Sequence, residues 1–496
     1  MEHVVATTLH GDVRGIVVDG VNAFRGIPYA APPFGANRFR APQPAQTWSG
    51  VRDALRFGPT PVMLGRPPPY DAFFASPTIP GEDCLNLNVW TPRLGGAGLP
   101  VMFWIHGGSF ETGTGASPWY DGSRFARDGV VCVTINYRVG ADGFVCLGGG
   151  DANVGLLDQV AALRWVHDNI AAFGGDPSNV TVFGESAGGM SVGALLSMPC
   201  AEGLFRRAIA QSGAAHHSVS AETALRMGRR LARRLGVEAT RDAMAEVPTD
   251  RLLTVQQTLK GELFADPDPK RWGPEVVGSM MLWQPVVDAD VIPARPIDRI
   301  EAGAAADVDV MVGTTTEEWR LFLVLAGVID TITSEALART VDAYGLPVAE
   351  ALALYRAGRL SATAGDLFAA VQTDWFFRVP ALRLADAHAP GSSATYMYEF
   401  GWRSTRYRGA LGSCHGLEIP FVFDTLGSHT ALLCGPHPPQ RLADVMHAAW
   451  VAFAREGDPG WPRYDLDRRA TMRFDTNCAV VEDPHAVERT LWAGKR

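Results

Sequence analysis

Cysteine is scarce in this sequence, with seven scattered residues among 496. An odd number of widely spaced cysteines is a poor disulfide framework, and no Cys-x-x-Cys pair indicates zinc. We therefore expect free thiols, no metal and a reducing compartment. Cys132 and Cys146 have apolar sequence neighbours and are predicted to be buried.

Long runs of like charge and long runs of apolar residues are also missing. The net charge of −9 comes without a block of either sign, whereas nucleic-acid-binding proteins usually carry a basic face. No apolar run approaches the length that crosses a bilayer. The N-terminal MEHVVATTLHGDVRG lacks a basic segment followed by an apolar one, so no secretory signal is visible. We expect a cytoplasmic monomer or small homo-oligomer with neither nucleic acid nor membrane as a partner.

Hydrophobic residues make up 47% of the chain, which indicates a globular protein with a large core. Apolar residues at 156, 160, 163, 166 and 170 predict an amphipathic helix. Such helical patterns alternate with nearly continuous apolar runs, which are listed here as predicted strands: 99–108 (ended by two glycines), 130–138, 179–183, 206–213, 307–315 and 394–400. This alternation predicts an α/β fold, with a mostly parallel central sheet covered by helices on both faces.

We expect one domain over residues 1–496. Helix-rich cap regions are predicted at about 218–278 and 320–390. Two stretches rich in proline and glycine, 22–44 and 57–83, are predicted to be irregular.

Ser186 lies in Gly-Glu-Ser-Ala-Gly, which matches the pattern G-x-S-x-G. In this pattern a nucleophilic serine projects from a sharp turn between a strand and a helix. An apolar run precedes the motif, and a helical, glycine-containing segment follows it. The context favours a nucleophile over the alternative, a glycine-rich turn with an idle serine.

A nucleophilic serine needs backbone N–H groups at the place where negative charge develops. Ala187 follows the serine and supplies one candidate N–H group. The turn His-Gly-Gly that ends the apolar run 99–108 supplies two more, from Gly107 and Gly108. His106 itself is interpreted as structural.

The base and the acid should follow the serine, because the triad order in α/β-hydrolases is serine, acid, histidine. Among twelve histidines, His415 stands out because it lies between small residues and an apolar run, beyond the strand 394–400. Glu317 and Glu318 follow the strand 307–315, and ligands bind at strand carboxyl ends in such sheets. The residues alone do not choose between the two glutamates.

Several segments together resemble the type-B carboxylesterases, the family of bacterial para-nitrobenzyl esterases and animal cholinesterases, over nearly the whole chain. They are FRGIPYAAPPFGANRFRAPQP, EDCLNLNVW, NVGLLDQVAALRWVHDNIAAFGGDP, GESAGG, SCHGLEIPFVF and WVAFAREGDPGWPRY. The resemblance implies an α/β-hydrolase fold with helical cap insertions.

The resemblance also implies roles for single residues. Ser186 matches the nucleophile, His415 the general base, and Glu318, the second of the acidic pair, the triad acid. Gly107, Gly108 and Ala187 match the oxyanion donors, and Glu185 is interpreted as a buried structural contact. The large apolar residues near these positions are predicted to line the substrate pocket: Phe110, Met190, Trp319 and Phe322.

Two departures from the family pattern stand out. Trp319 replaces the glycine that usually follows the acid, so the nearby pocket is expected to be narrower. Secreted members pair the cysteine that matches Cys84 with an upstream cysteine, which is missing here. That absence fits a cytoplasmic, bacterial-type enzyme. The aromatic residues that bind choline in cholinesterases have no convincing match.

The expected function is hydrolysis of small carboxylic esters through an acyl-enzyme, without metal or organic cofactor. The same triad serves carbamates, amides, thioesters and lactones, which remain alternatives. A non-catalytic binding module is a third reading, and the presence of all three triad residues argues against it.

Overall fold

The centre of the molecule is a mostly parallel β-sheet, seen in a computed structural model that describes residues 2–65, 68–74 and 76–495. Its strand order is β1-β2-β3-β5-β7-β6-β8-β9-β12-β13-β14-β15, with β4 paired to β2. The strands span β1 (His3–Thr8), β2 (Gly11–Val18), β3 (Val21–Pro28), β4 (Val51–Asp53), β5 (Asn86–Thr91), β6 (Leu99–Ile105), β7 (Val131–Ile135), β8 (Gly175–Glu185), β9 (Arg207–Gln211), β12 (Asp309–Thr315), β13 (Thr395–Phe400), β14 (Ala470–Phe474) and β15 (Ala479–Glu482). Two short strands, β10 (Val219–Ser220) and β11 (Val286–Val287), pair separately.

The seven strands from β7 to β14 run parallel to one another. Every residue of β7 and β9 is buried, which is typical of strands covered on both faces. The predicted apolar strands and the mostly parallel sheet are therefore confirmed.

The N-terminal part of the sheet differs from the prediction. Strands β1, β2, β3, β5 and β7 form an antiparallel series. The predicted irregular character of 22–44 is wrong for residues 22–28, which belong to β3. Phe24 and Ile27 are fully buried there, and the pairing shifts between them around Gly26. Burial of apolar side chains outweighed the proline and glycine signals.

The second stretch predicted to be irregular, 57–83, includes residues 66–67 and 75, which lie outside the described residues. Its described part carries one short helix, α1 (Tyr70–Phe73).

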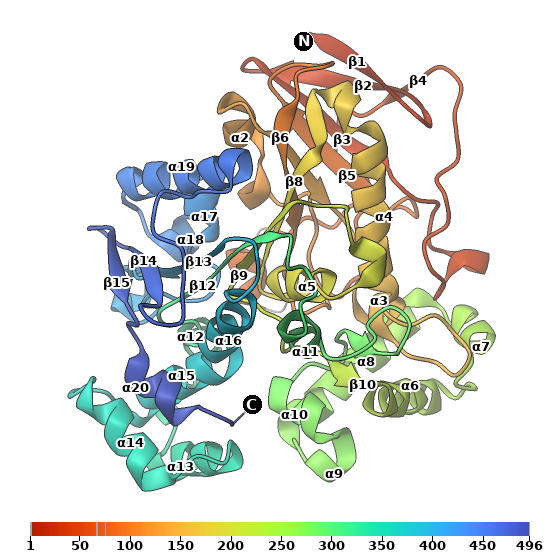
Figure 1. Cartoon of the computed structure of the whole chain (residues 1–496). Coiled ribbons are helices and arrows are strands. Elements are labelled where there is room, and N and C mark those ends of the chain that lie inside the picture. Colours follow the sequence, from red (N-terminus) through yellow and green to blue (C-terminus); the bar gives the residue numbers. More distant parts are fainter. Residues whose placement is uncertain (1, 66–67, 75, 496) are drawn as a thin grey trace.

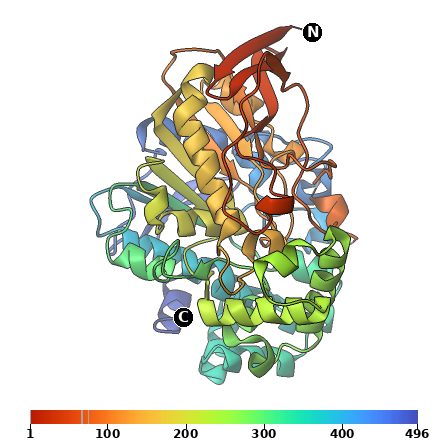
Figure 2. The ribbon, with the colours of Figure 1, turned by 90° about the vertical axis from the view of Figure 1, so that its right-hand side faces the viewer.

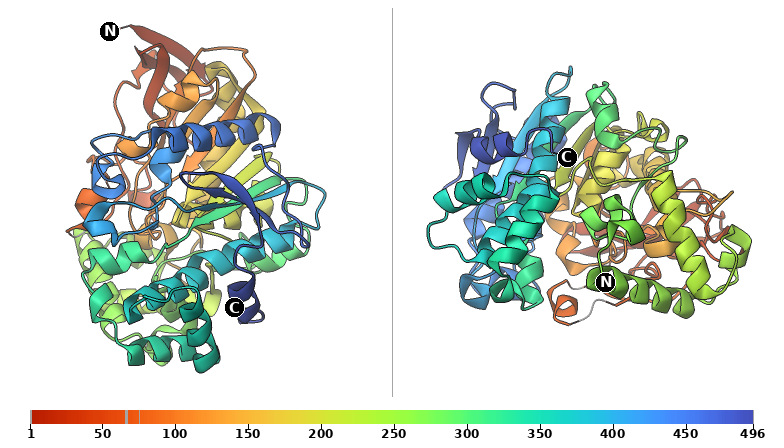
Figure 3. Two further views of the ribbon diagram at one scale, coloured as in Figure 1. Left: turned by 90° about the vertical axis from the view of Figure 1, so that its left-hand side faces the viewer. Right: turned by 90° about the horizontal axis from the view of Figure 1, so that it is seen from below.

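Helices cover both faces of the sheet. The predicted amphipathic helix forms α4 (Val154–Asn169) and crosses one face (Figure 2). Helix α19 (Gln440–Glu456) crosses the opposite face (Figure 3, left). The other helices of this body are α2 (Ser123–Arg127), α3 (Gly140–Phe144), α5 (Ala187–Leu195), α11 (Pro296–Glu301), α17 (Ile419–Val422) and α18 (Ala431–Cys434). Helix α20 (Ala486–Leu491) lies apart from these and packs against α14 (Val348–Ala357).

Two further groups of helices lie at the end of the sheet away from the N-terminus (Figure 1). The first comprises α6 (Ala221–Leu235), α7 (Arg241–Ala245), α8 (Thr249–Ala265), α9 (Pro269–Trp272) and α10 (Pro274–Ser279). The second comprises α12 (Arg320–Leu325), α13 (Ser334–Ala343), α14 (Val348–Ala357), α15 (Ala364–Thr373), the π-helical turn η6 (Asp374–Arg378) and α16 (Val379–His388). Helix α5, which follows β8, lies between the sheet and these groups, and α12 begins the second group after β12 (Figure 1).

All seven cysteines are free. Cys132 is buried as predicted, whereas the prediction is wrong for Cys146, which is partly exposed. Cys146 packs at the edge of a small cluster around Val219 and Val286, outside the main core. Among the described residues, no helix combines the length and apolar character needed to span a bilayer.

Candidate active site

Ser186 lies on a strained turn between β8 and α5. Its φ of 58° and ψ of −124° fall outside the regions that side chains normally allow. A Cβ on Gly184 would lie 2.7 Å from the Gly188 carbonyl carbon, and one on Gly188 would lie 2.0 Å from the Ile105 oxygen. Because no side chain fits at these two positions, the spacing of G-x-S-x-G follows from backbone contacts. Ser186 is itself partly exposed.

The turn after β6 approaches this elbow closely. A Cβ on Gly107 would lie 3.0 Å from the Ser186 Cβ and 2.7 Å from the Glu185 backbone oxygen. Gly108 has a φ of +125°, which favours glycine. His106 is buried against this turn, its Nδ1 2.9 Å from the Gly107 oxygen. The structure thus places the His-Gly-Gly turn beside Ser186.

His415 and Glu318 are joined by a hydrogen bond of 2.7 Å between Nδ1 and Oε2. The other carboxylate oxygen of Glu318 accepts bonds from Thr315 N at 2.8 Å and Ser212 Oγ at 2.6 Å. Glu318 is fully buried and His415 is 5% exposed. Three donors therefore fix the carboxylate, which in turn fixes the orientation of the imidazole ring.

Glu317 faces a different environment. It pairs with Arg403 and Arg320, and it accepts a hydrogen bond from Ser413 N at 3.0 Å. The two adjacent glutamates, which the sequence did not separate, therefore differ in their partners, and only Glu318 binds His415.

The second ring nitrogen of His415 points back to the elbow. Nε2 lies 3.1 Å from the carboxylate of Glu185, the residue before Ser186. Burial lowers the His415 pKa, but the negative charges of Glu185 and Glu318 outweigh it and raise the pKa to about 9. These carboxylates therefore favour an imidazolium at this position.

A third carboxylate, Glu418, is buried in the same place. Its oxygen lies 3.3 Å from Ser212 Oγ. Burial, reinforced by the charges of Glu185 and Glu318, raises the Glu418 pKa well above its usual value. The protonated form of Glu418 is therefore favoured.

Aromatic rings surround His415 on the side of the second helix group. The ring of Phe377 is centred 4.6 Å from the imidazole and that of Phe322 5.4 Å from it. Trp319 packs against Phe322 at 4.8 Å and against Phe376 at 5.1 Å. Two of the predicted pocket residues, Trp319 and Phe322, are thus brought together near the histidine.

The other two predicted pocket residues are buried in the core. Phe110 is fully buried and packs against Phe144 at 4.8 Å. Met190 is buried within the same core cluster. Their role in a pocket stays a prediction.

Several residues of this site were missed by sequence reasoning. Ser212 follows β9 directly, so its place at the carboxyl end of a strand was a usable signal. Glu418 is three residues after His415, and its carboxylate in an apolar run was a second signal. Phe376 and Phe377 had no such signal, because a π-helical turn far along the chain delivers them.

A cavity of about 400 Å³ lies on another side of the Glu317 loop. Four arginines are among its lining residues: Arg320, Arg359, Arg378 and Arg403. Neither Ser186 nor His415 lines it. Among the described residues, no group of three or more histidine, cysteine, aspartate or glutamate side chains is arranged to hold a metal ion.

Comparison with known proteins agrees with this architecture. The model of the carboxylesterase family matches residues 1–491. The chain is 37% identical to the para-nitrobenzyl esterase of Bacillus subtilis (strain 168), covering 99% of this chain and 98% of that one. It is 38% identical to the phenmedipham hydrolase of Pseudarthrobacter oxydans, covering 98% and 99% respectively.

Among solved structures, the chain is similar to the Geobacillus stearothermophilus carboxylesterase EST55 at pH 6.2. The TM-score is 0.86 at 40% identity, over 98% of this chain and 99% of that one. The architecture described above is accordingly the α/β-hydrolase fold. The chain belongs to the carboxylesterase family and is a carboxylic ester hydrolase.

Proposed function

We propose that this protein hydrolyses small carboxylic esters through an acyl-enzyme on Ser186, with His415 as the general base and Glu318 as the acid that orients it. One observation carries the proposal: Glu318 binds Nδ1 of His415 at 2.7 Å while Nε2 faces the elbow that bears Ser186. In a triad of this kind the acid holds Nδ1 and Nε2 takes the proton of the serine. Here Nε2 lies 3.1 Å from the carboxylate of Glu185, the chain neighbour of Ser186.

In the first step His415 accepts the proton of Ser186, and Oγ forms a bond to the ester carbonyl carbon. The negative charge moves to the carbonyl oxygen, where the N–H groups of Gly107, Gly108 and Ala187 stabilise it. The carbonyl then re-forms, the bond to the alcohol oxygen breaks, and the imidazolium donates its proton to the alcohol.

Water repeats the sequence in the second step. His415 takes a proton from water, the resulting hydroxide attacks the acyl carbon, and the acid leaves as Ser186 recovers its proton. Glu318 keeps its charge throughout, because its role is to hold the Nδ1 proton and stabilise the imidazolium. The close approach of Gly107 to Ser186 supports the placement of the oxyanion donors.

Hydrolysis of p-nitrophenyl butyrate by Ser186→Ala tests the proposal. Loss of a triad serine costs roughly a million-fold in kcat in the subtilisin example, so we expect no turnover above background. The matched control is Ser191→Ala, since Ser191 is buried in the following helix and binds Gln159 at 3.0 Å. The control should keep wild-type kcat within about threefold.

A second readout identifies the nucleophile directly. A p-nitrophenyl phosphonate should react with the wild-type protein, forming a bond between phosphorus and Ser186 Oγ and releasing p-nitrophenolate. Mass spectrometry should find the adduct on the peptide that contains Ser186. Near wild-type turnover by Ser186→Ala, or an adduct on another residue, would contradict the proposal.

A further inference from the structure

The loop between β12 and α12 carries Glu318 and is held from one side by the end of β13 and by the segment that bears His415. The Thr316 amide donates to the Phe400 oxygen at 2.9 Å, and the Glu317 amide donates to the Ser413 oxygen at 2.9 Å. These bonds fix one side of the loop relative to the sheet. The opposite side of the loop is held by other contacts.

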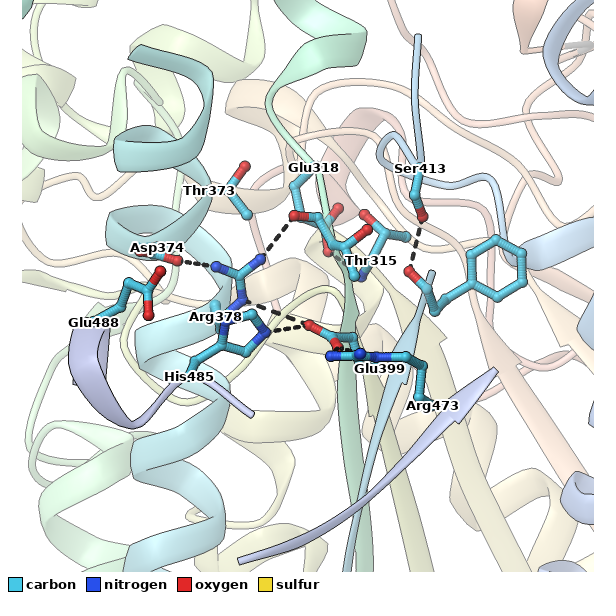
Figure 4. Close-up of polar contacts among 12 residues, drawn as sticks. Thr315, Glu318, Thr373, Asp374, Arg378, Glu399, Ser413, Arg473, His485 and Glu488 are labelled. Atoms are coloured by element: carbon cyan, nitrogen blue, oxygen red, sulfur yellow. Dashed lines mark hydrogen bonds and ion pairs between the residues drawn. The ribbon is translucent and has the colours of Figure 1, made fainter. Parts of the chain in front are cut away.

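The opposite side is held by a single turn of the second helix group. The Trp319 amide donates to Thr373 Oγ1 at 3.2 Å, and Arg378 Nη2 donates to the Thr316 oxygen at 2.7 Å. One bond therefore acts on the residue after Glu318 and the other acts two residues before it. Figure 4 shows Thr373 and Arg378 on this side of the loop.

We propose that Thr373 and Arg378 are positioning residues that hold the Glu318 carboxylate in place for His415. The inference rests on the proposed function. It adds a support for the triad acid that is formed by the π-helical turn η6 and the residue before it, a segment remote in sequence from Ser186 and Glu318.

The π-helical turn explains why two residues five positions apart reach the same loop. In an α-helix of 3.6 residues per turn, they would point about 140° apart. Here the Val379 amide bonds to the Asp374 oxygen, five residues back, which widens the turn. That widening brings Thr373 and Arg378 toward one face. Such turns are rare and frequently lie at functional sites.

The charges around Arg378 keep its guanidinium in one position. Arg378 is 2% exposed and pairs with Asp374, which is fully buried and also accepts a bond from Tyr355. Its Nε lies 4.0 Å from Glu399, which binds His485 on its far side (Figure 4). A buried planar guanidinium fixed in this way cannot rotate without leaving charges unpaired.

Thr373 offers the sharper test, because two substitutions separate its hydroxyl from its shape. Thr373→Val keeps the volume and removes the acceptor for the Trp319 amide, whereas Thr373→Ser keeps the acceptor. Displacements of about 1 Å can lower catalysis on the order of a hundredfold. Thr373→Val loses one of the two bonds that hold the loop, so we expect its kcat to be about tenfold lower than wild type and its KM to stay within about twofold of wild type. In Thr373→Ser we expect kcat within about twofold of wild type.

The pH profile separates positioning from general destabilisation. The bond from Glu318 raises the His415 pKa in the wild type. If Glu318 moves away in Thr373→Val, the acid limb of kcat/KM should shift to lower pH, which loss of folded protein would not cause. Arg378→Lys should lower kcat as well, and its melting temperature shows whether it folds.

Each outcome decides the matter. A wild-type kcat and pH profile in Thr373→Val would overturn the inference. Equal impairment of Thr373→Ser and Thr373→Val would also overturn it, because that result would show that Thr373 acts through packing and not through its hydroxyl group. Wild-type protein without esterase activity would instead end the proposed function and the inference with it. If the wild-type protein turns over ester, Ser186→Ala abolishes this turnover and Thr373→Val leaves it unchanged, the proposed function stands and only the inference fails.

Discussion

The adjacent pair Glu317 and Glu318 offers a matched experiment on the proposed triad. Each is changed to glutamine, so that size is kept and charge is lost. The Glu318 carboxylate accepts three hydrogen bonds, from His415 Nδ1 at 2.7 Å, Thr315 N at 2.8 Å and Ser212 Oγ at 2.6 Å. A glutamine has one acceptor oxygen, so its NH₂ group must face at least one of these donors.

The expected loss follows from those contacts. Hydrogen bonds to a charged group contribute about 1.5–3 kcal/mol each, and each 1.36 kcal/mol is tenfold in rate. Loss of one or two such bonds corresponds to roughly tenfold to ten-thousandfold in kcat, and the chymotrypsin-type aspartate-to-asparagine change costs about ten-thousandfold. We therefore expect Glu318→Gln to lower kcat by about a thousandfold or more.

Glu317→Gln serves as the control. Its side chain is 22% exposed and pairs with Arg403, which is 57% exposed. Exposed pairs of this kind contribute about 0–1 kcal/mol, and the glutamine oxygen can still accept from Ser413 N. We expect kcat within about threefold of wild type. The assay is steady-state hydrolysis of p-nitrophenyl butyrate, with melting temperatures to show that both variants fold. Equal, mild effects, or a larger loss in Glu317→Gln, would refute the reasoning.

Three further changes test other parts of the account. Gly107→Ala places a Cβ 2.7 Å from the Glu185 backbone oxygen, so kcat should fall at least tenfold; a wild-type rate would contradict the close approach. Glu185→Gln removes a charge that raises the His415 pKa, so the acid limb of kcat/KM should move to lower pH. Asp158→Asn leaves Arg138 buried without its ion pair of 2.6 Å, so urea unfolding should show a loss of about 3–5 kcal/mol; a loss below about 1 kcal/mol would contradict it.

Much of the fold could be predicted because its signals are local. Strands β6 and β7 are nearly continuous apolar runs, and α4 shows the spacing of one helical face, so these elements were read directly. The turn around Ser186 was recognisable because close backbone contacts demand glycine at fixed positions. By contrast, β3 contains glycine and proline within a buried strand, and only its pairing with β5 reveals it.

The rest of the site depends on which strands are neighbours. Ser212 reaches Glu318 because β9 pairs with β12. The sequences of these two strands do not indicate that they are neighbours in the sheet. Phe377 reaches His415 because the π-helical turn η6 packs beside β12. Such residues are recognised only after the chain is folded, since no pattern near them in sequence indicates the contact.

The surplus of carboxylates around His415 has a consequence for the chemistry. Burial and its acidic neighbours raise the Glu418 pKa well above its usual value, which favours the neutral form of that side chain. The carboxylates of Glu318 and Glu185 face the two ring nitrogens. In the proposed mechanism, both would stabilise the imidazolium that forms when His415 takes the serine proton. The same charges raise the His415 pKa to about 9, so the imidazole is protonated over a wide range below that pH. An enzyme built in this way favours the proton-transfer step and, in exchange, loses activity as the pH falls, so its kcat/KM should increase toward alkaline pH.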